Sequence, residues 1–303
     1  MIRRSIPLLL AALACAGCSE SEESKAVERD PLAPYPATGV TKTIDLSVKD
    51  TLWEVGPGAV YQAVAYNGQI PGPPIEVNAG DHVTIHLTNK ASKPYSIHTH
   101  VVKFTKGNDG TDDDVVQPGK SKDYEWDAVF AGTFPYHDHA NEAEGIKLGL
   151  FGMLIVHAPD ELPANEHLVV LSDFDPMEYK TLPGVADPVT GEFPDAGTYR
   201  GGHEYMHTIN GKAYEDAVPP FTGKVGDLSR WRVVSIGQEF HTWHIHGHRW
   251  LDASKQLTDN VELGPGLYTT FEFHEDNPGD WLVHCHVPNH MEGGMMARYI
   301  VSP

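Results

Sequence analysis

Hydrophobic and polar residues alternate in short runs from about Thr41 onward. In residues 81–88 three aliphatic side chains alternate with polar ones. One face of this run would be buried and the other solvated, as in a half-buried β-strand. Turn signals such as Asn67-Gly68 and the proline-rich residues 71–74 separate the runs. Because no long segment has a helical period, the pattern predicts an all-β protein, built as a sandwich or a barrel.

The N-terminal residues depart from this pattern. Two arginines precede a short apolar run at residues 6–14, which is typical of an export signal and too short to span a bilayer. Residues 16–18 resemble a lipoprotein cleavage site with Cys18 as the lipidated residue, and an ordinary cleaved signal peptide is the alternative. We therefore expect a signal peptide over residues 1–18 and a polar linker over residues 19–40. The protein would be exported, either periplasmic or membrane-anchored as a lipoprotein.

Charge and cysteine content limit the possible functions. The chain has 22 basic and 42 acidic residues and a formal net charge of −20. This balance argues against nucleic acid as a partner, because the phosphate backbone demands a basic surface. Cys15 and Cys18 belong to the leader, so the folded part keeps only Cys285. A disulfide framework is therefore excluded, and metal ligation would explain a lone cysteine in an exported protein.

Eight histidines form four pairs, each with one residue between its members. The pairs are His98 and His100, His137 and His139, His244 and His246, and His284 and His286. The first pair lies 146 residues before the third, and the second lies 147 residues before the fourth. This spacing indicates an internal duplication, with one β-domain over residues 41–160 and a second over residues 161–303.

Cys285 lies between the two histidines of the last pair. His290 follows five residues after the cysteine and Met295 follows ten after it. A thiolate, imidazoles and a weak axial thioether are the ligands of a blue-copper electron-transfer site. Successive side chains of a strand point to opposite faces. One strand can therefore hold a copper ion on its cysteine side and offer two imidazoles to a second metal centre behind it.

The two copies differ at the candidate blue-copper ligands. The duplication places His241, Cys285, His290 and Met295 opposite Tyr95, Asp138, Ala143 and Leu148, respectively. All four candidate ligands are thus present in the second copy and absent from the first, whereas the histidine pairs are present in both. We expect one blue-copper site, in the second domain, and a histidine-rich cluster that draws on both domains.

These motifs together resemble the four copper motifs of the multicopper oxidases, in particular those of the small two-domain bacterial laccases. The resemblance covers most of residues 41–303 and implies two cupredoxin-like Greek-key β-sandwich domains. It also implies four copper ions per chain: one type 1, one type 2 and a type 3 pair. The small laccases further imply a homotrimer, in which each trinuclear cluster lies between the first domain of one chain and the second domain of the next.

The resemblance assigns a ligand set to each kind of copper. Type 1 copper would be held by His241, Cys285 and His290, with Met295 as the axial ligand. Type 2 copper would be held by His98 and His244. The type 3 pair would be held by His100, His137, His139, His246, His284 and His286.

The implied reaction moves electrons from type 1 copper through Cys285 and its two histidine neighbours to the trinuclear site, where four electrons reduce dioxygen to water. Since this reduction consumes protons, Asp109 is a candidate proton relay, and a simple turn aspartate before Gly110 is the alternative. Small laccases often carry a tyrosine near position 104. This chain has Phe104, which argues against a tyrosyl radical at that place.

The leading hypothesis is a laccase-like oxidase of phenols or aromatic amines, with dioxygen and a small-molecule reductant as its partners. An oxidase of cuprous or ferrous ions is the main alternative, although no methionine-rich segment for cuprous ion is present. A copper nitrite reductase would carry its type 1 cysteine in the first domain. A copper electron carrier would have no use for the type 3 histidines.

Overall fold

The alternating runs of the sequence form strands. In β4 (His82–Asn89), Val83, Ile85 and Leu87 are buried and the residues between Val83 and Leu87 are half-buried, as the alternation predicts. The computed structural model describes residues 29–56, 59–174 and 206–303. The predicted signal peptide, the candidate lipid site and residues 19–28 of the predicted linker lie outside these residues. No helix of the described chain is long and apolar enough to cross a membrane.

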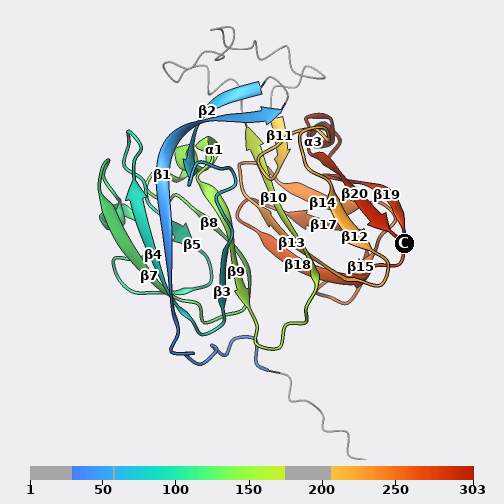
Figure 1. Ribbon diagram of the computed structural model, residues 1–303, viewed down its shortest axis with the longest axis horizontal. Coiled ribbons are helices and arrows are strands. Elements are labelled where there is room, and N and C mark those ends of the chain that lie inside the picture. The colour runs from blue at the N-terminus through green and yellow to red at the C-terminus, as the bar shows by residue number, and fades with distance from the viewer. Residues whose placement is uncertain (1–28, 57–58, 175–205) are drawn as a thin grey trace, which may run out of the picture. The chain divides into compact units, whose positions relative to one another are not determined.

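Two sheets form the first half of the fold (Figure 1). The first has the order β2-β1-β4-β7-β6. Besides β4, its strands are β1 (Thr41–Gly56), β2 (Ala59–Tyr66), β6 (Lys103–Phe104) and β7 (Ser121–Asp127). The second has the order β3-β9-β8-β5. Its strands are β3 (Ile75–Asn78), β5 (His98–Thr99), β8 (Gly132–His137) and β9 (Phe151–His157).

The second half repeats this plan. One sheet has the order β11-β10-β13-β18, with β10 (Asn165–Phe174), β11 (Met206–Ile209), β13 (Leu228–Ser235) and β18 (Tyr268–His274). The facing sheet has the order β12-β20-β19-β14-β17. Its strands are β12 (Phe221–Lys224), β14 (His241–Ile245), β17 (Asn260–Leu263), β19 (Gly279–His284) and β20 (Met296–Ser302). A separate hairpin joins β15 (Trp250–Leu251) and β16 (Leu257–Thr258).

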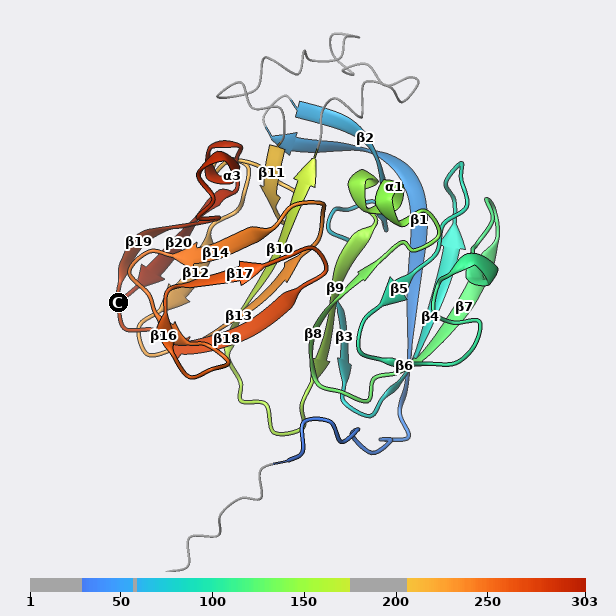
Figure 2. The ribbon, with the colours of Figure 1, turned by 180° about the vertical axis from the view of Figure 1, so that it is seen from behind.

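Matching strand pairs confirm that the halves are copies of one fold. The first half pairs β1 with β4 in parallel and β4 with β7 antiparallel. The second half pairs β10 with β13 in parallel and β13 with β18 antiparallel. Figure 2 shows the two halves side by side from behind. The prediction of an all-β fold of two β-sandwiches is confirmed.

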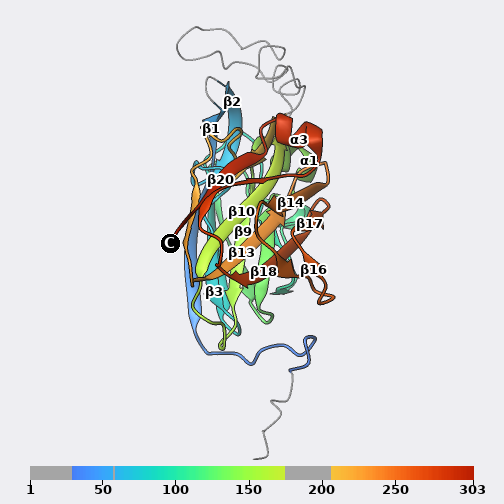
Figure 3. The same ribbon diagram turned by 90° about the vertical axis from the view of Figure 1, so that its right-hand side faces the viewer.

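A short helix follows the histidine-bearing strand of each half, which the sequence pattern did not predict. Helix α1 (Glu142–Leu148) follows β8, and α3 (Pro288–Glu292) follows β19. Both helices lie toward the same end of the sheets (Figure 3). A 3-10 turn, η1, covers Asp112–Asp114 in the loop after β6. Each half therefore carries its candidate metal ligands at the ends of strands and in the adjoining helix or loop.

The halves contact each other through a long hairpin and a charged cluster. The β1–β2 hairpin reaches over the second half, where Trp53 Nε1 donates to the carbonyl of Gly211 at 2.6 Å. In the charged cluster, the buried side chain of Arg232 donates to Thr133 Oγ1 of the first half at 3.1 Å. The same guanidinium binds Glu161 in the connecting segment. These contacts fix the two halves against each other.

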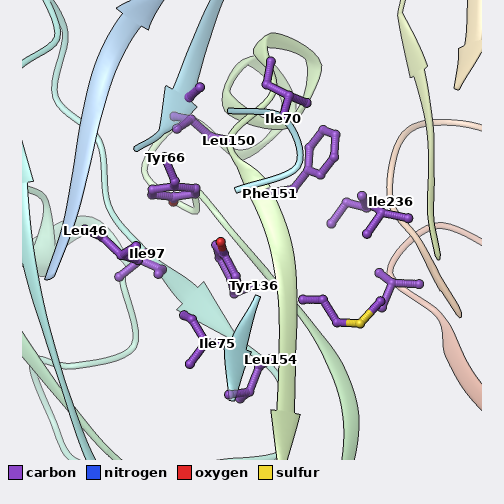
Figure 4. Close-up of a cluster of buried hydrophobic side chains, with 14 of the residues drawn as sticks. Leu46, Tyr66, Ile70, Ile75, Ile97, Tyr136, Leu150, Phe151, Leu154 and Ile236 are labelled. Carbon is purple, nitrogen blue, oxygen red and sulfur yellow. The ribbon is translucent and has the colours of Figure 1, made fainter. Parts of the chain in front are cut away.

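An apolar core fills the first sandwich and continues to the contact with the second. Figure 4 shows part of it, where Ile75, Ile97 and Leu154 lie around Tyr136. The second sandwich has its own cluster, which includes Cys285 and Met295. The lone cysteine thus lies inside a hydrophobic core, and the histidine pairs lie at its edge.

Candidate metal centres

Three of the predicted type 1 ligands meet in the second sandwich. His241 begins β14, Cys285 follows β19 and His290 lies in α3. The Nδ1 atoms of the two histidines are 3.1 Å apart, and Cys285 Sγ lies 3.7 Å from His290 Nδ1. All three side chains are buried. Two imidazole nitrogens and one sulfur thus converge on a space the size of a metal ion, which is the donor set that copper prefers.

Met295 and Thr242 bind Cys285 through their backbones. Met295 is fully buried in the same apolar cluster. Its backbone carbonyl accepts a hydrogen bond from Cys285 N at 3.1 Å, which ties the end of β19 to the start of β20. Thr242 N points at the sulfur, 3.3 Å from Cys285 Sγ. A backbone N–H aimed at sulfur stabilises its negative form, so the site favours a thiolate.

The charges around the sulfur are arranged for metal binding. Burial alone would raise the pKa of Cys285, but hydrogen bonds from His241 and His290 outweigh it and lower this pKa to about 6. Burial would likewise lower the pKa of His241, but Asp173 and Cys285 raise it to about 9. The metal-free pair is therefore an imidazolium beside a thiolate, and a bound copper ion would replace the imidazolium proton.

Two carboxylates hold the outer edges of the imidazoles, and the sequence pattern predicted neither. Asp173 Oδ1 lies 3.1 Å from His241 Nε2, and Glu239 Oε2 lies 2.8 Å from His290 Nε2. A carboxylate on Nε2 fixes the ring and leaves Nδ1 to face the metal. His207 stacks on His290 with ring centroids 4.0 Å apart, and its Nε2 lies 3.2 Å from Glu239 Oε2. Neither acid lies in a recognisable motif, so no sequence signal identified them.

In the first half, Asp138 occupies the place of the cysteine, as the duplication predicts. Ser96 N donates to Asp138 Oδ1 at 2.7 Å, just as Thr242 N points at the sulfur of Cys285. Ser96 Oγ then accepts a hydrogen bond from His139 N at 3.1 Å. In the second half Thr242 Oγ1 accepts one from His286 N at 2.7 Å. The carboxylate thus substitutes for the thiolate within the same hydrogen-bond frame.

Two counterparts predicted from the fixed spacing are wrong. Leu150 O accepts a hydrogen bond from Asp138 N, as Met295 O does from Cys285 N, so Leu150 rather than Leu148 stands opposite Met295. The connection in the first half is two residues longer, since α1 has 7 residues and α3 has 5.

The same shift replaces Ala143 by Gly145 as the counterpart of His290. A Cβ atom added to Gly145 would lie 2.4 Å from Asp138 Oδ2, so no imidazole fits there. Tyr95 stands before Ser96 as His241 stands before Thr242. The first half therefore has none of the four expected type 1 ligands at the corresponding positions.

The four histidines of the first half form one cluster. Ligand nitrogens of His98, His100 and His137 all lie within 4.8 Å of one another, and the ring of His139 lies 4.9 Å from that of His98. The Nδ1 atom of His98 is hydrogen-bonded to the carbonyl of Asp109 at 2.6 Å. His98 therefore keeps its proton on Nδ1 and turns Nε2 toward the other rings.

The four histidines of the second half form a matching cluster. Ligand nitrogens of His244, His246 and His284 lie within 4.8 Å of one another, and the ring of His286 lies 5.2 Å from that of His244. His244 Nδ1 is hydrogen-bonded to the carbonyl of Asp259 at 2.7 Å. Each half thus presents a set of imidazoles whose inward nitrogens can bind metal.

Burial keeps most of these imidazoles neutral. It lowers the pKa of His137 to about 4. It also lowers the pKa of His98, His100, His246 and His284. Since a metal binds only the neutral ring, these histidines are ready to ligate at neutral pH.

The two histidine clusters do not meet within one chain. Among the described residues, every candidate metal cluster draws its histidines from one half only. His100 instead faces the turn between β17 and β18, where an added Cβ on Gly266 would lie 3.7 Å from its Cε1 atom. The ligands that the family resemblance assigns to one trinuclear centre therefore lie in two separate half-sites.

The side chain of Asp109 forms a local turn. Its Oδ1 atom accepts a hydrogen bond from Thr111 Oγ1 at 2.9 Å, and this bond lowers the pKa of Asp109. The backbone carbonyl of the same residue binds His98. The residue therefore contacts the first histidine cluster through its backbone, with an ionised carboxylate close by.

Comparisons with known proteins identify the family of the chain. Family models described as multicopper oxidase match residues 47–161 and 189–303. A solved structure, the blue copper oxidase from Nitrosomonas europaea, is 30% identical and has a TM-score of 0.74, with 86% of each chain covered. Another solved multicopper oxidase is 26% identical with a TM-score of 0.73, covering 90% of this chain and 94% of the other.

Two curated proteins are also similar. Ceruloplasmin from Mus musculus is 32% identical over 77% of this chain and 24% of its own length. A probable nitrite reductase-hydroxylamine oxidoreductase fusion protein from Kuenenia stuttgartiensis is 32% identical over 86% of this chain and 31% of its own length. The chain thus spans about a quarter to a third of these relatives. Because family models match both halves, the chain belongs to the multicopper oxidase family.

Proposed function

We propose that the protein is a laccase-like oxidase that takes single electrons from phenols or aromatic amines and reduces dioxygen to water. The observation that carries the proposal is the position of Cys285, whose sulfur lies in the core while His284 and His286 belong to a half-site for a second centre. Bound copper would supply the one-electron redox steps and the binding of dioxygen. The chain supplies a short covalent path between the two centres.

The residues divide into the sets that the family resemblance implies. We assign His241, Cys285, His290 and Met295 to type 1 copper. We assign His98 and His244 to type 2 copper, and His100, His137, His139, His246, His284 and His286 to the type 3 pair. The donor chemistry supports these assignments, because imidazole and thiolate suit copper and offer nothing to hard oxygen-liganded ions.

Other activities have less support. A nitrite reductase of this fold would carry its type 1 cysteine in the first domain, where this chain has Asp138. An electron carrier would need no half-sites of four histidines. We also propose that the protein is exported, with Cys18 as its lipid-bearing residue, and that Asp109 relays protons to the dioxygen site.

The half-sites support a homotrimer. Each chain presents one histidine cluster on its first half and one on its second, and the two do not meet among the described residues. A complete trinuclear site then needs the first half of one chain and the second half of another. We propose that three chains close into a ring with three such sites.

The metal content of the purified full chain is the first test. We expect about four copper ions per chain, an intense blue absorption band and oxygen consumption with a phenol. The variant Cys285→Ser should lose the blue band and one copper ion, whereas His86→Ala, on the exposed face of β4, should keep both. One copper ion per chain together with a blue band and no oxygen consumption would contradict the oxidase.

The ionisation of Cys285 provides a second test, made on the copper-free chain. The thiolate absorbance should appear with a midpoint near pH 6, against the ordinary value of 9.0 expected after unfolding in urea. The depressed pKa stabilises the fold above pH 9, and this contribution is lost as the pH falls through 6. The spectrum of Cys285→Ser is subtracted, because Cys15 and Cys18 also absorb. A folded-state midpoint near 9 would contradict the imidazole–thiolate arrangement.

Subunit mixing tests the shared sites. The variants His100→Ala and His246→Ala should each be inactive, because each spoils every trinuclear site. Co-expressed in equal amounts, they should regain roughly a quarter of the wild-type activity, since random closed rings pair an intact first half with an intact second half at that frequency. If every site were formed within one chain, mixing would restore nothing.

The outer edge of the type 1 site supports an organic donor. Phe240 is 56% exposed, and its ring lies 6.3 Å from that of His290. An exposed aromatic ring beside a ligand imidazole can stack a phenol or an aromatic amine close to the electron entry point. The carboxylate of Glu239, adjacent in sequence, would favour an amine that carries positive charge.

The same edge also favours the second candidate, a ferrous-ion oxidase. His207, Glu239 and His290 hold their ligand atoms within 4.8 Å of one another, and the relatives include a protein named ferroxidase from Homo sapiens. A carboxylate and an imidazole are suitable ligands for a ferrous ion.

Variants at this edge separate the two donors. Phe240→Ala should lower kcat/KM for a phenol by about 2–10-fold, as expected for the loss of one aromatic contact worth about 0.5–1.5 kcal/mol. The same variant should leave oxidation of ferrous ion unchanged. If His207→Ala instead abolished ferrous oxidation and Phe240→Ala had no effect on any phenol, the metal-ion oxidase would replace the laccase.

A further inference from the structure

A buried tyrosine in the second sandwich binds a buried carboxylate that the proposed reaction does not use. Tyr299 donates its phenolic hydrogen to Glu275 Oε2 at 2.7 Å. The other oxygen of this carboxylate lies 2.8 Å from His248 Nε2. All three residues are buried. Burial, reinforced by Glu275, raises the pKa of Tyr299, so the phenol keeps its proton at neutral pH.

Aromatic rings connect this tyrosine to the strand that carries the metal ligands. Trp243 lies between His241 and His244 on β14, and its ring is 5.8 Å from that of Trp231. The ring of Trp231 is 5.2 Å from that of Tyr299. Tryptophan and tyrosine are among the side chains that release an electron most readily, so this row of rings can carry an electron step by step.

The row continues from the tyrosine toward the surface. The ring of His248 lies 5.3 Å from that of Tyr299 and 5.8 Å from that of Trp281. Trp281 is half-buried and stands directly opposite Tyr299 on the neighbouring strand. The row thus begins beside the metal ligands and ends at a ring that solvent molecules can reach.

The first half shows that the fold does not require these residues. Strand registers place Ile85 opposite Trp231 and Leu154 opposite Tyr299. The duplication places Ile97 opposite Trp243. All three aliphatic residues are fully buried, and Figure 4 shows Ile97 and Leu154 in the apolar core.

The polar members of the row also have apolar counterparts. Backbone hydrogen bonds place Ala128 opposite Glu275: Glu275 N bonds to Asp227 O as Ala128 N bonds to Asp81 O. The duplication places Val102 opposite His248. A buried carboxylate is costly, and an apolar residue at the same place avoids that cost. The half that holds the type 1 ligands therefore keeps a polar, oxidisable row that its copy replaces with hydrocarbon.

We propose that Trp243, Trp231 and Tyr299 form a relay that carries oxidising equivalents away from the copper sites, with Glu275 as the proton acceptor of Tyr299. The relay protects the protein when dioxygen turnover proceeds without enough donor. It rests on the proposed function, because the copper sites in dioxygen turnover supply the oxidant.

Each step of the relay conserves electrons and protons. Trp243 gives one electron to the oxidising site and regains one from Trp231, which regains one from Tyr299. As Tyr299 loses its electron, its O–H bond breaks and an O–H bond forms on Glu275, which leaves a neutral tyrosyl radical. An external one-electron donor at Trp281 returns the electron, and the proton returns from Glu275 to the phenol oxygen.

Photochemical oxidation of the full copper-loaded chain tests the relay without dioxygen. A ruthenium(II) polypyridyl complex, excited by a light flash under argon, gives one electron to an added cobalt(III) ammine acceptor. The ruthenium(III) complex so formed withdraws one electron from the protein surface, and electron paramagnetic resonance then detects the radical. We expect a tyrosyl signal that narrows when the chain contains ring-deuterated tyrosine. The signal should be lost in Tyr299→Phe and weakened severalfold in Glu275→Gln, which keeps the side-chain shape but accepts no proton.

Tyr66→Phe is the matched control, because Tyr66 is equally buried and donates its hydroxyl to a backbone carbonyl, that of Ser96, at 2.7 Å. Its variant should keep the signal. Circular dichroism verifies that each variant is folded. Trp281→Phe, which removes the oxidisable ring between the surface and Tyr299 and should also reduce the signal, replaces Tyr299→Phe if that variant does not fold. A tyrosyl signal that persists in Tyr299→Phe, or no tyrosyl signal in the wild type, would overturn the relay.

A second measurement links the relay to turnover. Under dioxygen with scarce phenol, Tyr299→Phe should lose activity severalfold faster than the wild type and accumulate oxidised Trp231 and Trp243, detected by mass spectrometry. Equal rates of loss would overturn the protective role. A chain that forms the radical by light but consumes no oxygen would refute the proposed oxidase and leave the electron pathway standing, so the two failures are distinguishable.

Discussion

The structure depends on the alternation of side chains along the last histidine-bearing strand. Because neighbouring residues of an extended chain face opposite ways, Cys285 enters the hydrophobic core while His284 and His286 turn to the histidine cluster at its edge. The buried sulfur needs positive partners, which His241 and His290 provide, and these imidazoles in turn need Asp173 and Glu239. The imidazoles thus offset the free-energy cost of burying the thiolate, and the carboxylates offset the cost of burying the imidazoles.

The first half shows what this frame becomes without a sulfur ligand. Asp138 receives the same backbone N–H that points at the sulfur in the second half, and Gly145 leaves room for its carboxylate. The histidines on either side of it still gather into one cluster. The frame therefore does not depend on the sulfur, because a hydrogen-bonded acceptor at this position is sufficient to place two imidazoles.

Much of the fold and the ligand sets could be predicted from sequence because they follow from local rules. The alternation of apolar and polar residues identified the strands. The nearly equal separations of corresponding histidines, such as His98 and His244, identified the duplication. The predicted counterparts of Met295 and His290 were wrong because the connection that contains α1 is two residues longer than the one that contains α3. This difference lies after the last histidine pair of the first half, so the distances between histidine pairs do not reveal it. The residues Asp173, Glu239 and His207 were missed because they reach the site through tertiary packing from separate strands and loops. Single acidic residues carry no periodic signal.

The buried guanidinium of Arg232 has a consequence for assembly. It joins Glu161 in the connecting segment to Thr133 of the first half, and so fixes the angle between the two half-sites of one chain. In a head-to-tail contact, the angle that each copy adds decides whether successive copies close on themselves or continue as an open filament. In the proposed ring, the contacts of Arg232, together with the contact of Trp53 with Gly211, would then decide how many copies close on themselves.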